Sequence, residues 1–321
     1  MIDPLSALYD LPLDELLEQA WAMRQAHFPP ELRLSAPSPK RYEVDSYRNA
    51  PDRFVAISLT GRACQLKCEH CQGRLLESMH AATSPGDLRR LGDALIEQGC
   101  QGVLLSGGAD REGRVPLDGY QEAIAYLKQR GLKVIVHTGL VDRRTAFSLK
   151  EAGVDQVLID IIGDEDTIRQ VYHLEKTPAD YWESLACLKE ADLAIAPHII
   201  IGLHFGQIRG ELEALRRITA AQTQAIILVV LNPIPDTPMQ ACPPPPPEEI
   251  GRLAAAARVL NPHARLALGC ARPASALKVR MERLAIQAGI NVLAYPCQES
   301  LDFARSLGLA TEFSEMCCSL L

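Results

Sequence analysis

Three cysteines with the spacing of metal ligands, Cys64, Cys68 and Cys71, lie within eight residues of one another. Thiolates are soft ligands that favour zinc, copper(I) or iron–sulfur centres. Three of them can hold three corners of a four-iron cluster and leave the fourth iron without a protein ligand. The spacing therefore predicts a metal centre at which one iron is open for chemistry.

A zinc ion is the alternative occupant of this motif. Zinc sites usually have four ligands at recognisable spacing, often as two Cys-x2-Cys pairs. His70 lies inside the motif, but the sequence contains no second Cys-x2-Cys pair. The iron–sulfur interpretation is therefore preferred.

The elements that would position this motif alternate between short apolar runs and amphipathic runs, which indicates eight strand–helix units. Continuous apolar strands are typical of a parallel sheet buried on both faces. We expect an α/β fold, a (βα)8 TIM-type barrel over 51–308, preceded by a helix and connector over 1–50 and followed by a cysteine-containing tail over 309–321. The strands are expected at 54–60, 103–105, 134–136, 156–160, 194–201, 225–231, 265–268 and 290–294.

In such barrels the active site lies at the carboxyl ends of the strands. The cysteine motif follows the first predicted strand, so it belongs at that end. Other candidate residues follow later strands, and two adjacent glycines among them would let the backbone approach a ligand closely. These candidates are Gly107 and Gly108 after the second strand, Thr138 after the third, Asp160, Asp164 and Arg169 at and after the fourth, and Gly202 after the fifth.

The bulk composition excludes several classes of partner. The 321 residues carry a formal net charge of −7 and no basic run, so affinity for nucleic acid through charge is not expected. The first residues show no signal-peptide pattern, and apolar runs such as 225–231 are too short to span a bilayer. We expect a soluble, cytoplasmic protein without a membrane partner, in which ten cysteines serve metal or redox chemistry.

The cysteine loop after the first strand of a barrel resembles the radical S-adenosylmethionine (SAM) superfamily. This resemblance implies a [4Fe–4S] cluster bound by Cys64, Cys68 and Cys71, with SAM on the fourth iron. Reductive cleavage of SAM would yield a 5′-deoxyadenosyl radical that removes hydrogen from an unreactive C–H bond. The cofactors would carry out this step, while the barrel positions them and excludes water. A ferredoxin or flavodoxin would supply the electron.

The same resemblance implies roles for the residues at the strand ends. Gly107 and Gly108 resemble the glycine motif that receives the amino group of SAM, although Ala109 stands where an acid is often found. Arg169 resembles the arginine that meets the SAM carboxylate, for which a planar guanidinium is suited. The remaining implied cofactor contacts are His70 beside the third cysteine, Thr138 and Asp160 or Asp164 for the ribose and amino end, and Gly202 near the adenine.

A second set of cysteines suggests a second cluster. Cys270 follows the seventh strand and Cys297 the eighth, while Cys317 and Cys318 lie in the tail. The carboxyl ends of adjacent strands share one rim, and a tail of about ten residues can reach roughly 30 Å to return there. We therefore expect these four cysteines to hold an auxiliary iron–sulfur cluster, with incidental thiols at a frayed terminus as the alternative.

The chain most resembles the biotin-synthase-like group of the superfamily, and within it a subunit of the two-component lipoyl synthases. It lacks the N-terminal cysteine triplet of single-chain lipoyl synthases, and no interior set of arginine and cysteines can be assigned as the sulfur site of a biotin synthase. The resemblance implies sulfur insertion into an octanoylated carrier protein, together with a homologous radical SAM subunit. The alternatives are biotin-type sulfur insertion, a carbon-skeleton mutase or maturase, and a non-enzymatic iron–sulfur protein.

Overall fold

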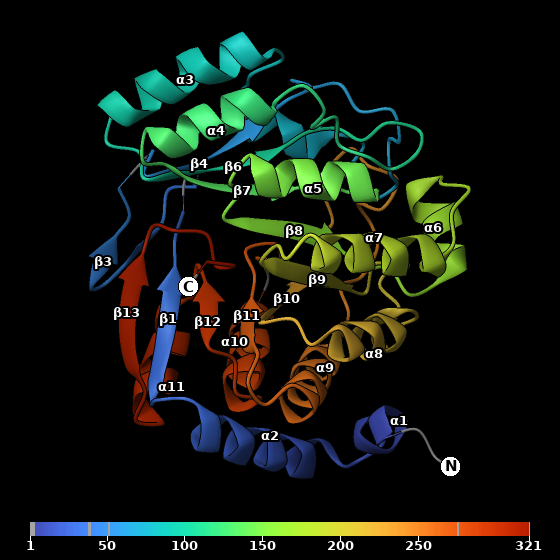
Figure 1. Ribbon diagram of the computed structural model, residues 1–321. Coiled ribbons are helices and arrows are strands. Elements are labelled where there is room, and N and C mark those ends of the chain that lie inside the picture. The colour runs from blue at the N-terminus through green and yellow to red at the C-terminus, as the bar shows by residue number, and fades with distance from the viewer. Residues whose placement is uncertain (1–3, 38–39, 51, 275, 321) are drawn as a thin grey trace.

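The eight strands predicted for the barrel are all present in the computed structural model, which describes residues 4–320 except 38–39, 51 and 275. They are β4 (Phe54–Ser58), β6 (Gly102–Ser106), β7 (Lys133–His137), β8 (Gln156–Asp160), β9 (Ile195–Ile201), β10 (Ala225–Val230), β11 (Arg265–Leu268) and β12 (Val292–Ala294). Neighbouring strands among them run parallel. They form a sheet that curls around a central space (Figure 1). The α/β fold of TIM-barrel type is thus confirmed.

Three further strands join this sheet. Strand β5 (His80–Ala81) pairs with β4, while β1 (Glu31–Ser35) lies between β12 and β13 (Ala310–Ser314). The order is β13-β1-β12-β11-β10-β9-β8-β7-β6-β4-β5, so β13 and β5 are its edge strands. In the described part of the chain β12 pairs with β1 and β11 rather than with β4, and the curled sheet is therefore open where an ideal barrel would close.

The helices follow the strands as predicted, and their first turns explain where several of them begin. The side chains of Ser84, Asp142 and Asp164 accept hydrogen bonds from first-turn amides of α3, α5 and α6, which satisfies donors that a helix leaves free. The helices are α1 (Pro4–Tyr9), α2 (Leu13–His27), α3 (Pro85–Glu97), α4 (Gln121–Gln129), α5 (Arg143–Glu151), α6 (Glu165–Tyr172), α7 (Pro178–Glu190), α8 (Glu211–Ala221), α9 (Pro247–Leu260), α10 (Lys278–Gln287) and α11 (Gln298–Ser306), with a 3₁₀ helix, η1, at Arg74–Ser78.

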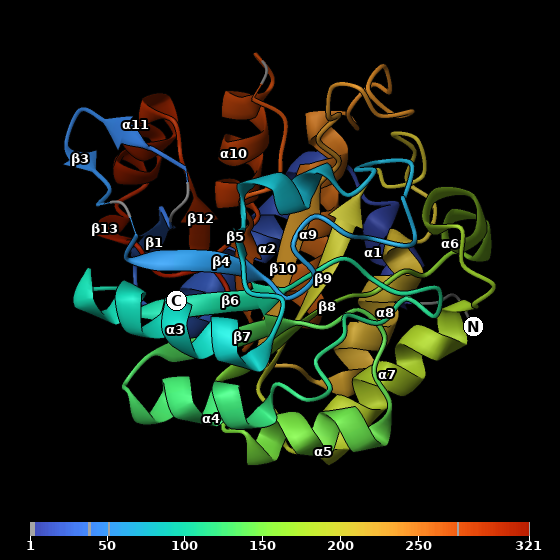
Figure 2. The same cartoon turned by 90° about the horizontal axis from the view of Figure 1, so that it is seen from above.

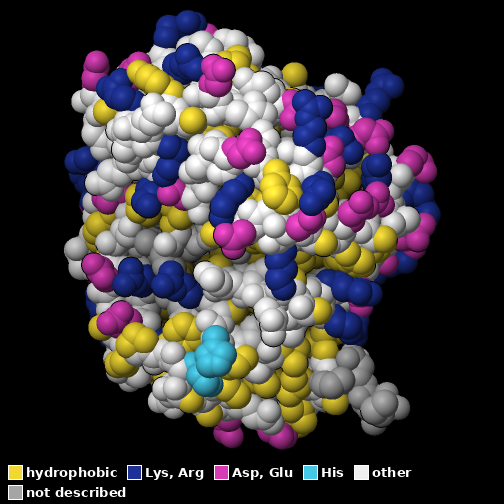
Figure 3. Space-filling model, in the orientation of Figure 1, with side chains coloured by type: hydrophobic (Ala, Val, Ile, Leu, Met, Phe, Trp, Pro, Cys, Tyr) yellow, Lys and Arg dark blue, Asp and Glu magenta, His cyan; other side chains and the backbone are white. Residues whose placement is uncertain are grey.

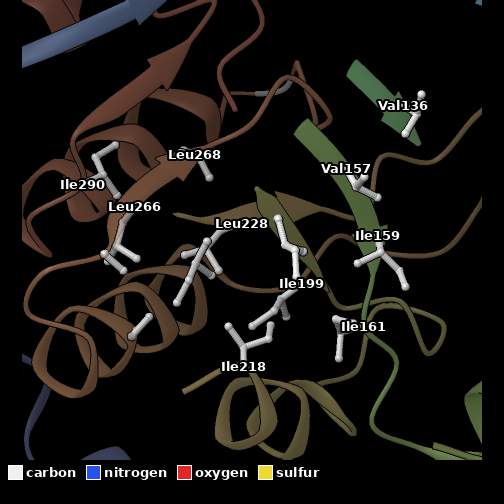
Figure 4. Close-up of a cluster of buried hydrophobic side chains, with 14 of the residues drawn as sticks. Val136, Val157, Ile159, Ile161, Ile199, Ile218, Leu228, Leu266, Leu268 and Ile290 are labelled. Carbon is white, nitrogen blue, oxygen red and sulfur yellow. The ribbon is translucent and has the colours of Figure 1, made fainter. Parts of the chain in front are cut away.

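Alternation along each strand separates two faces of the sheet. In β8, Val157 and Ile159 belong to the large core between strands and helices, whereas Leu158 belongs to a smaller cluster on the inner face. Figure 4 shows Val157 and Ile159 on the side where Ile218 of α8 approaches. Figure 2 shows α3, α4 and α5 running along the outside of the curled sheet. The helices therefore bury the outer face, and the inner face is left for the site.

The segment before the first barrel strand is more than a connector. Its helix α2 packs against α9, and β1 then enters the sheet. A short antiparallel pair, β2 (Glu43–Val44) and β3 (Tyr47–Arg48), follows. The ring of Tyr47 stacks on Phe313 of β13 at 4.0 Å between centroids. The segment from β1 to β3 and the last strand, β13, are thus tied together at one edge of the sheet.

The surface charge and the lengths of the helices bear on whether nucleic acid or a membrane could be a partner. Basic and acidic side chains are interspersed over the face shown in Figure 3, in keeping with the net charge of −7. In the described part of the chain, no helix is long and apolar enough to cross a membrane.

Candidate active site

A cavity of about 270 Å³ lies at the carboxyl ends of β4, β6, β7 and β8. The cysteine loop forms one wall and the turns after the other strands form the rest. Seven of the residues predicted from the sequence line it, namely Cys64, Cys68, His70, Cys71, Gly107, Gly108 and Asp160. The structure therefore gathers the cysteine motif, the glycine motif and one strand-end carboxylate around one space.

The cysteine loop is held in place by backbone contacts. The amides of Cys71 and Gln72 both donate to the carbonyl of Cys68, which makes a tight turn between the second and third cysteines. The amide of Glu69 donates to the carbonyl of Val171 in α6, which fixes the loop to the barrel. Cys68 and Cys71 are buried and Cys64 is partly buried. Such a loop can present three thiols without rearrangement.

The electrostatics of this loop favour a thiolate at one position. The hydrogen bond with Cys68 lowers the pKa of Cys71 against the effect of burial, and a hydrogen bond with His70 lowers it further. The same bond and burial raise the pKa of Cys68. Burial alone would lower the pKa of His70, but Cys71 and the charge of Asp160 raise it. A metal ligand must be the thiolate, so this arrangement is suited to metal binding.

Gly108 lets the turn after β6 approach the cysteine loop closely. A Cβ atom at this position would lie 2.0 Å from the carbonyl oxygen of Ala63 and 2.5 Å from Cα of Cys64. The amide of Gly108 donates to Oγ1 of Thr60 at 2.7 Å, and the amide of Gln65 donates to the carbonyl of Ala109 at 2.9 Å. The glycine motif therefore supports the cysteine loop directly, whatever contact it makes with a ligand.

Two buried polar atoms at the cavity wall have no hydrogen-bond partner among the described residues. They are Nδ1 of His70 and the hydroxyl of Tyr172, whose rings lie 5.4 Å apart. Buried polar groups are normally paired, so unpaired ones beside a cavity indicate a missing ligand. Together with three soft thiols, they fit a cluster and a polar cofactor. Tyr172 was not predicted as a site residue, because the sequence around a tyrosine in the last turn of a helix does not indicate that its hydroxyl faces a cavity.

Four other residues predicted as cofactor contacts are not among those that line the cavity. Thr138 is buried, and its hydroxyl donates to the carbonyl of Gly139. Asp164 caps α6 and pairs with Arg209, and the amide of Gly202 donates to the Glu211 carboxylate. Arg169, which is exposed, pairs with Asp166 on its own helix. Their predicted contacts with SAM stay predictions.

Three of the four later cysteines come together on the inner face. Cys317 and Cys318 share a hydrogen bond, and both lie close enough to Cys270 to interact electrostatically. Cys270 is exposed by its surface area, yet desolvation by the surrounding protein and the charge of Cys317 raise the pKa of its thiol. Cys297 instead places its sulfur 2.8 Å from the Glu282 carboxylate. Three of the four predicted cluster ligands therefore lie close together, and their binding of a cluster stays a prediction.

The tail that carries two of these cysteines is an ordered part of the structure. The amide of Ala36 donates to the carbonyl of Ser314 at 2.9 Å, and the hydroxyl of Ser35 donates to the carbonyl of Met316 at 2.8 Å. Cys318 is buried among inward-facing residues of the sheet. The position of the two thiols is therefore set by strand pairing.

Comparison with known proteins agrees with this site. The Radical SAM superfamily model matches residues 58–218, half of the chain. The chain belongs to the radical SAM superfamily. A model of the Biotin and Thiamin Synthesis associated domain matches residues 228–303. The superfamily implies a four-iron cluster and SAM, which the three thiols and the unpaired polar atoms of the cavity fit.

Relatives of this radical SAM protein include the biotin synthase of Alkalilimnicola ehrlichii, 26% identical over 91% of this chain and 84% of that protein. The biotin synthase of Chromohalobacter salexigens is 25% identical over 92% of this chain and 75% of its own length. Among solved structures, methylornithine synthase has a TM-score of 0.63 at 14% identity and covers 96% of this chain and 93% of its own. The hydrogenase maturase HydG has a TM-score of 0.66 at 14% identity, with 97% and 71% covered. The structural likenesses show the fold alone, whereas the sequences place the chain near biotin synthases.

Proposed function

We propose that this radical SAM enzyme inserts sulfur into unactivated C–H positions of a saturated substrate, in a reaction of the biotin-synthase type. The observation that carries the proposal is the group formed by Cys270, Cys317 and Cys318 on the inner face of the sheet. Cys317 interacts with His137, which lines the cavity of the cysteine loop. A sulfur donor held there would adjoin the site of hydrogen abstraction.

When bound, the cluster and SAM supply a carbon radical that removes hydrogen from the substrate. The protein's own residues hold and shield these groups. Cys64, Cys68 and Cys71 bind the cluster, while the unpaired atoms of His70 and Tyr172 are free to hydrogen-bond the cofactor. Apolar side chains, among them Leu66, Leu76, Leu140 and Leu174, line the same cavity and exclude water. Water must be kept out because it would quench reactive intermediates.

The octanoyl chain is the second candidate substrate. The resemblance to lipoyl synthases is not supported by the comparisons, whose named relatives are biotin synthases. This candidate is supported by the fact that two of the cysteines proposed to hold the sulfur-donating cluster, Cys317 and Cys318, lie on the tail rather than at the strand ends. It also includes two partners, a homologous radical SAM subunit and an octanoylated carrier protein. A ferredoxin or flavodoxin as electron donor belongs to both candidates.

Iron and sulfide analysis of the full chain, reconstituted without oxygen, tests whether Cys270, Cys317 and Cys318 hold an auxiliary iron–sulfur cluster. Beyond the approximately four irons of the first cluster, we expect further iron that a Cys317→Ser/Cys318→Ser variant loses. Cys187→Ser is the matched control, because Cys187 lies in α7, which packs against α5 on the outside of the sheet. Equal iron content in the wild type and the double variant would contradict the proposal that Cys317 and Cys318 hold a sulfur-donating cluster.

Mass spectrometry of the products then separates the candidates. The reduced enzyme is incubated with SAM and either a sulfur-free precursor of biotin or an octanoylated carrier protein with the candidate partner. We expect sulfur to enter the biotin precursor. Cleavage of SAM without sulfur gain in either substrate would favour a mutase or maturase. Failure to cleave SAM at all would favour an iron–sulfur scaffold or electron carrier.

A further inference from the structure

Three metal-ligating side chains meet on the inner face of neighbouring strands. His137 ends β7, Asp160 ends β8, and His198 lies in β9 directly opposite Asp160 in the strand register. One ligand atom from each lies within 4.8 Å of the others. We propose that His137, Asp160 and His198 form a further metal site, separate from both cysteine groups, which binds a divalent ion of borderline hardness such as Zn²⁺ or Fe²⁺.

The distances suit such an ion. Nε2 of His137 lies 3.3 Å from Oδ1 of Asp160. Two ligands about 2.1 Å from a tetrahedral metal are about 3.4 Å apart, so this pair already has the required separation. The imidazole rings of His137 and His198 have centroids 5.4 Å apart and are inclined by 33°. The ligand atom of His198 lies within 4.8 Å of those of His137 and Asp160. Two imidazoles and one carboxylate are a ligand set that suits zinc and iron.

The protonation of His198 is already that of a metal ligand. Its Nδ1 lies 3.0 Å from the carbonyl oxygen of Ala196. Because a carbonyl can only accept, Nδ1 must carry the proton, and the lone pair of Nε2 is left free. Metal-bound histidines usually make this kind of second hydrogen bond, which orients the ring.

The position of the trio also argues against a purely structural role. Two residues earlier on each strand the inward-facing side chains are Ile135, Leu158 and Ala196, which pack in one apolar cluster. Inner layers of a barrel are normally filled by such apolar residues. The change from apolar to polar occurs one layer higher, where His137 and Asp160 line the cavity of the cysteine loop.

An ion bound by three protein ligands keeps an open position, as in catalytic zinc sites. That position would face the same cavity, and it suits an oxygen donor of the substrate, such as a carboxylate or carbonyl group. The site would therefore hold the polar end of a substrate whose carbon chain faces the cluster. Asp160 would then serve the metal rather than SAM.

Zinc loading of the full chain, with its iron–sulfur centre in place, tests the proposal. After equilibration with Zn²⁺ and removal of free metal, we expect one zinc per chain fewer in His198→Ala and His198→Gln than in the wild type. His80→Ala is the control, because His80 is an exposed histidine on β5. X-ray absorption at the zinc edge should show a nitrogen and oxygen shell at about 2.0–2.1 Å.

Two outcomes would overturn the proposal. One is a zinc content that is the same in the His198 variants and the wild type. The other is a shell of sulfur at about 2.3 Å alone, which would assign the zinc to cysteines. If the alanine variant is unstable, the glutamine variant, which is polar and of similar size, still decides the matter. Cleavage of SAM is not the readout, so the failure of this site would leave the proposed function standing.

Discussion

Replacement of Gly108 by alanine should loosen the cluster-binding loop without touching a cysteine. The added Cβ would meet the Ala63 carbonyl at 2.0 Å and Cα of Cys64 at 2.5 Å, both of them backbone atoms, whereas ordinary contact begins at 3.4 Å. One of the two loops must therefore move. Overpacking of this kind costs about 1–3 kcal/mol, which corresponds to a fall in Tm of about 2–6 °C for a chain of this size.

The neighbouring glycine provides a graded comparison. A Cβ on Gly107 would meet only side-chain atoms of Thr60 at 3.2 Å and its amide nitrogen at 3.4 Å, so Gly107→Ala should cost less. Iron content after anaerobic reconstitution and thermal unfolding of the iron-free chain are the two measurements. We expect Gly108→Ala to lose both iron and stability relative to Gly107→Ala. Equal iron and equal Tm in the two variants would refute the view that Gly108 supports the cysteine loop.

Two further predictions concern stability. Arg272 and Glu282 form a fully buried ion pair at 2.5 Å. Arg272→Met would leave the buried carboxylate with Lys278, at 3.6 Å, as its remaining cationic partner, and should cost about 3 kcal/mol in urea unfolding. Arg280→Met on the exposed face of α10 should cost less than about 1 kcal/mol, and similar losses in the two variants would contradict this assignment. Burial would raise the pKa of Asp155, but its hydrogen bond with Lys128 lowers it below the ordinary 3.8. The stabilisation by Asp155 is therefore present above about pH 4 and is lost as the pH falls through its folded pKa. Asp155→Asn should flatten the acid limb of the stability profile, and an unchanged limb would argue against this pairing.

The local elements of the fold follow from the sequence because their signals are local. Short apolar runs marked each barrel strand, and β9 (Ile195–Ile201) and β10 (Ala225–Val230) appear where they were expected. Helix starts at Asp142 and Asp164 likewise depend on a side chain and an amide three residues apart. The Cys64–Cys71 motif identified the metal centre for the same reason, since its ligands lie within one loop.

The strand order next to β12 could not be predicted in this way. Strand β1 pairs Glu31 with Ala310, so its neighbour is almost the whole chain away. The sequence of β1, with buried Leu32 and Leu34, fits a strand equally well at several positions in a sheet. Which strands it pairs with depends on packing across the entire sheet, and its pairing with β13 also gives the cysteine tail its place.

The sequence by itself determined the Cys64–Cys71 centre and the strands around it, because both are encoded by residues close together in the chain. The tertiary structure decided what else faces that centre. It placed Cys297 beside Glu282, and it brought His137 of β7 close to His198 of β9 across the intervening strand β8. The meeting of the two histidines depends on strand register, because a shift of one residue would move either side chain to the opposite face of the sheet.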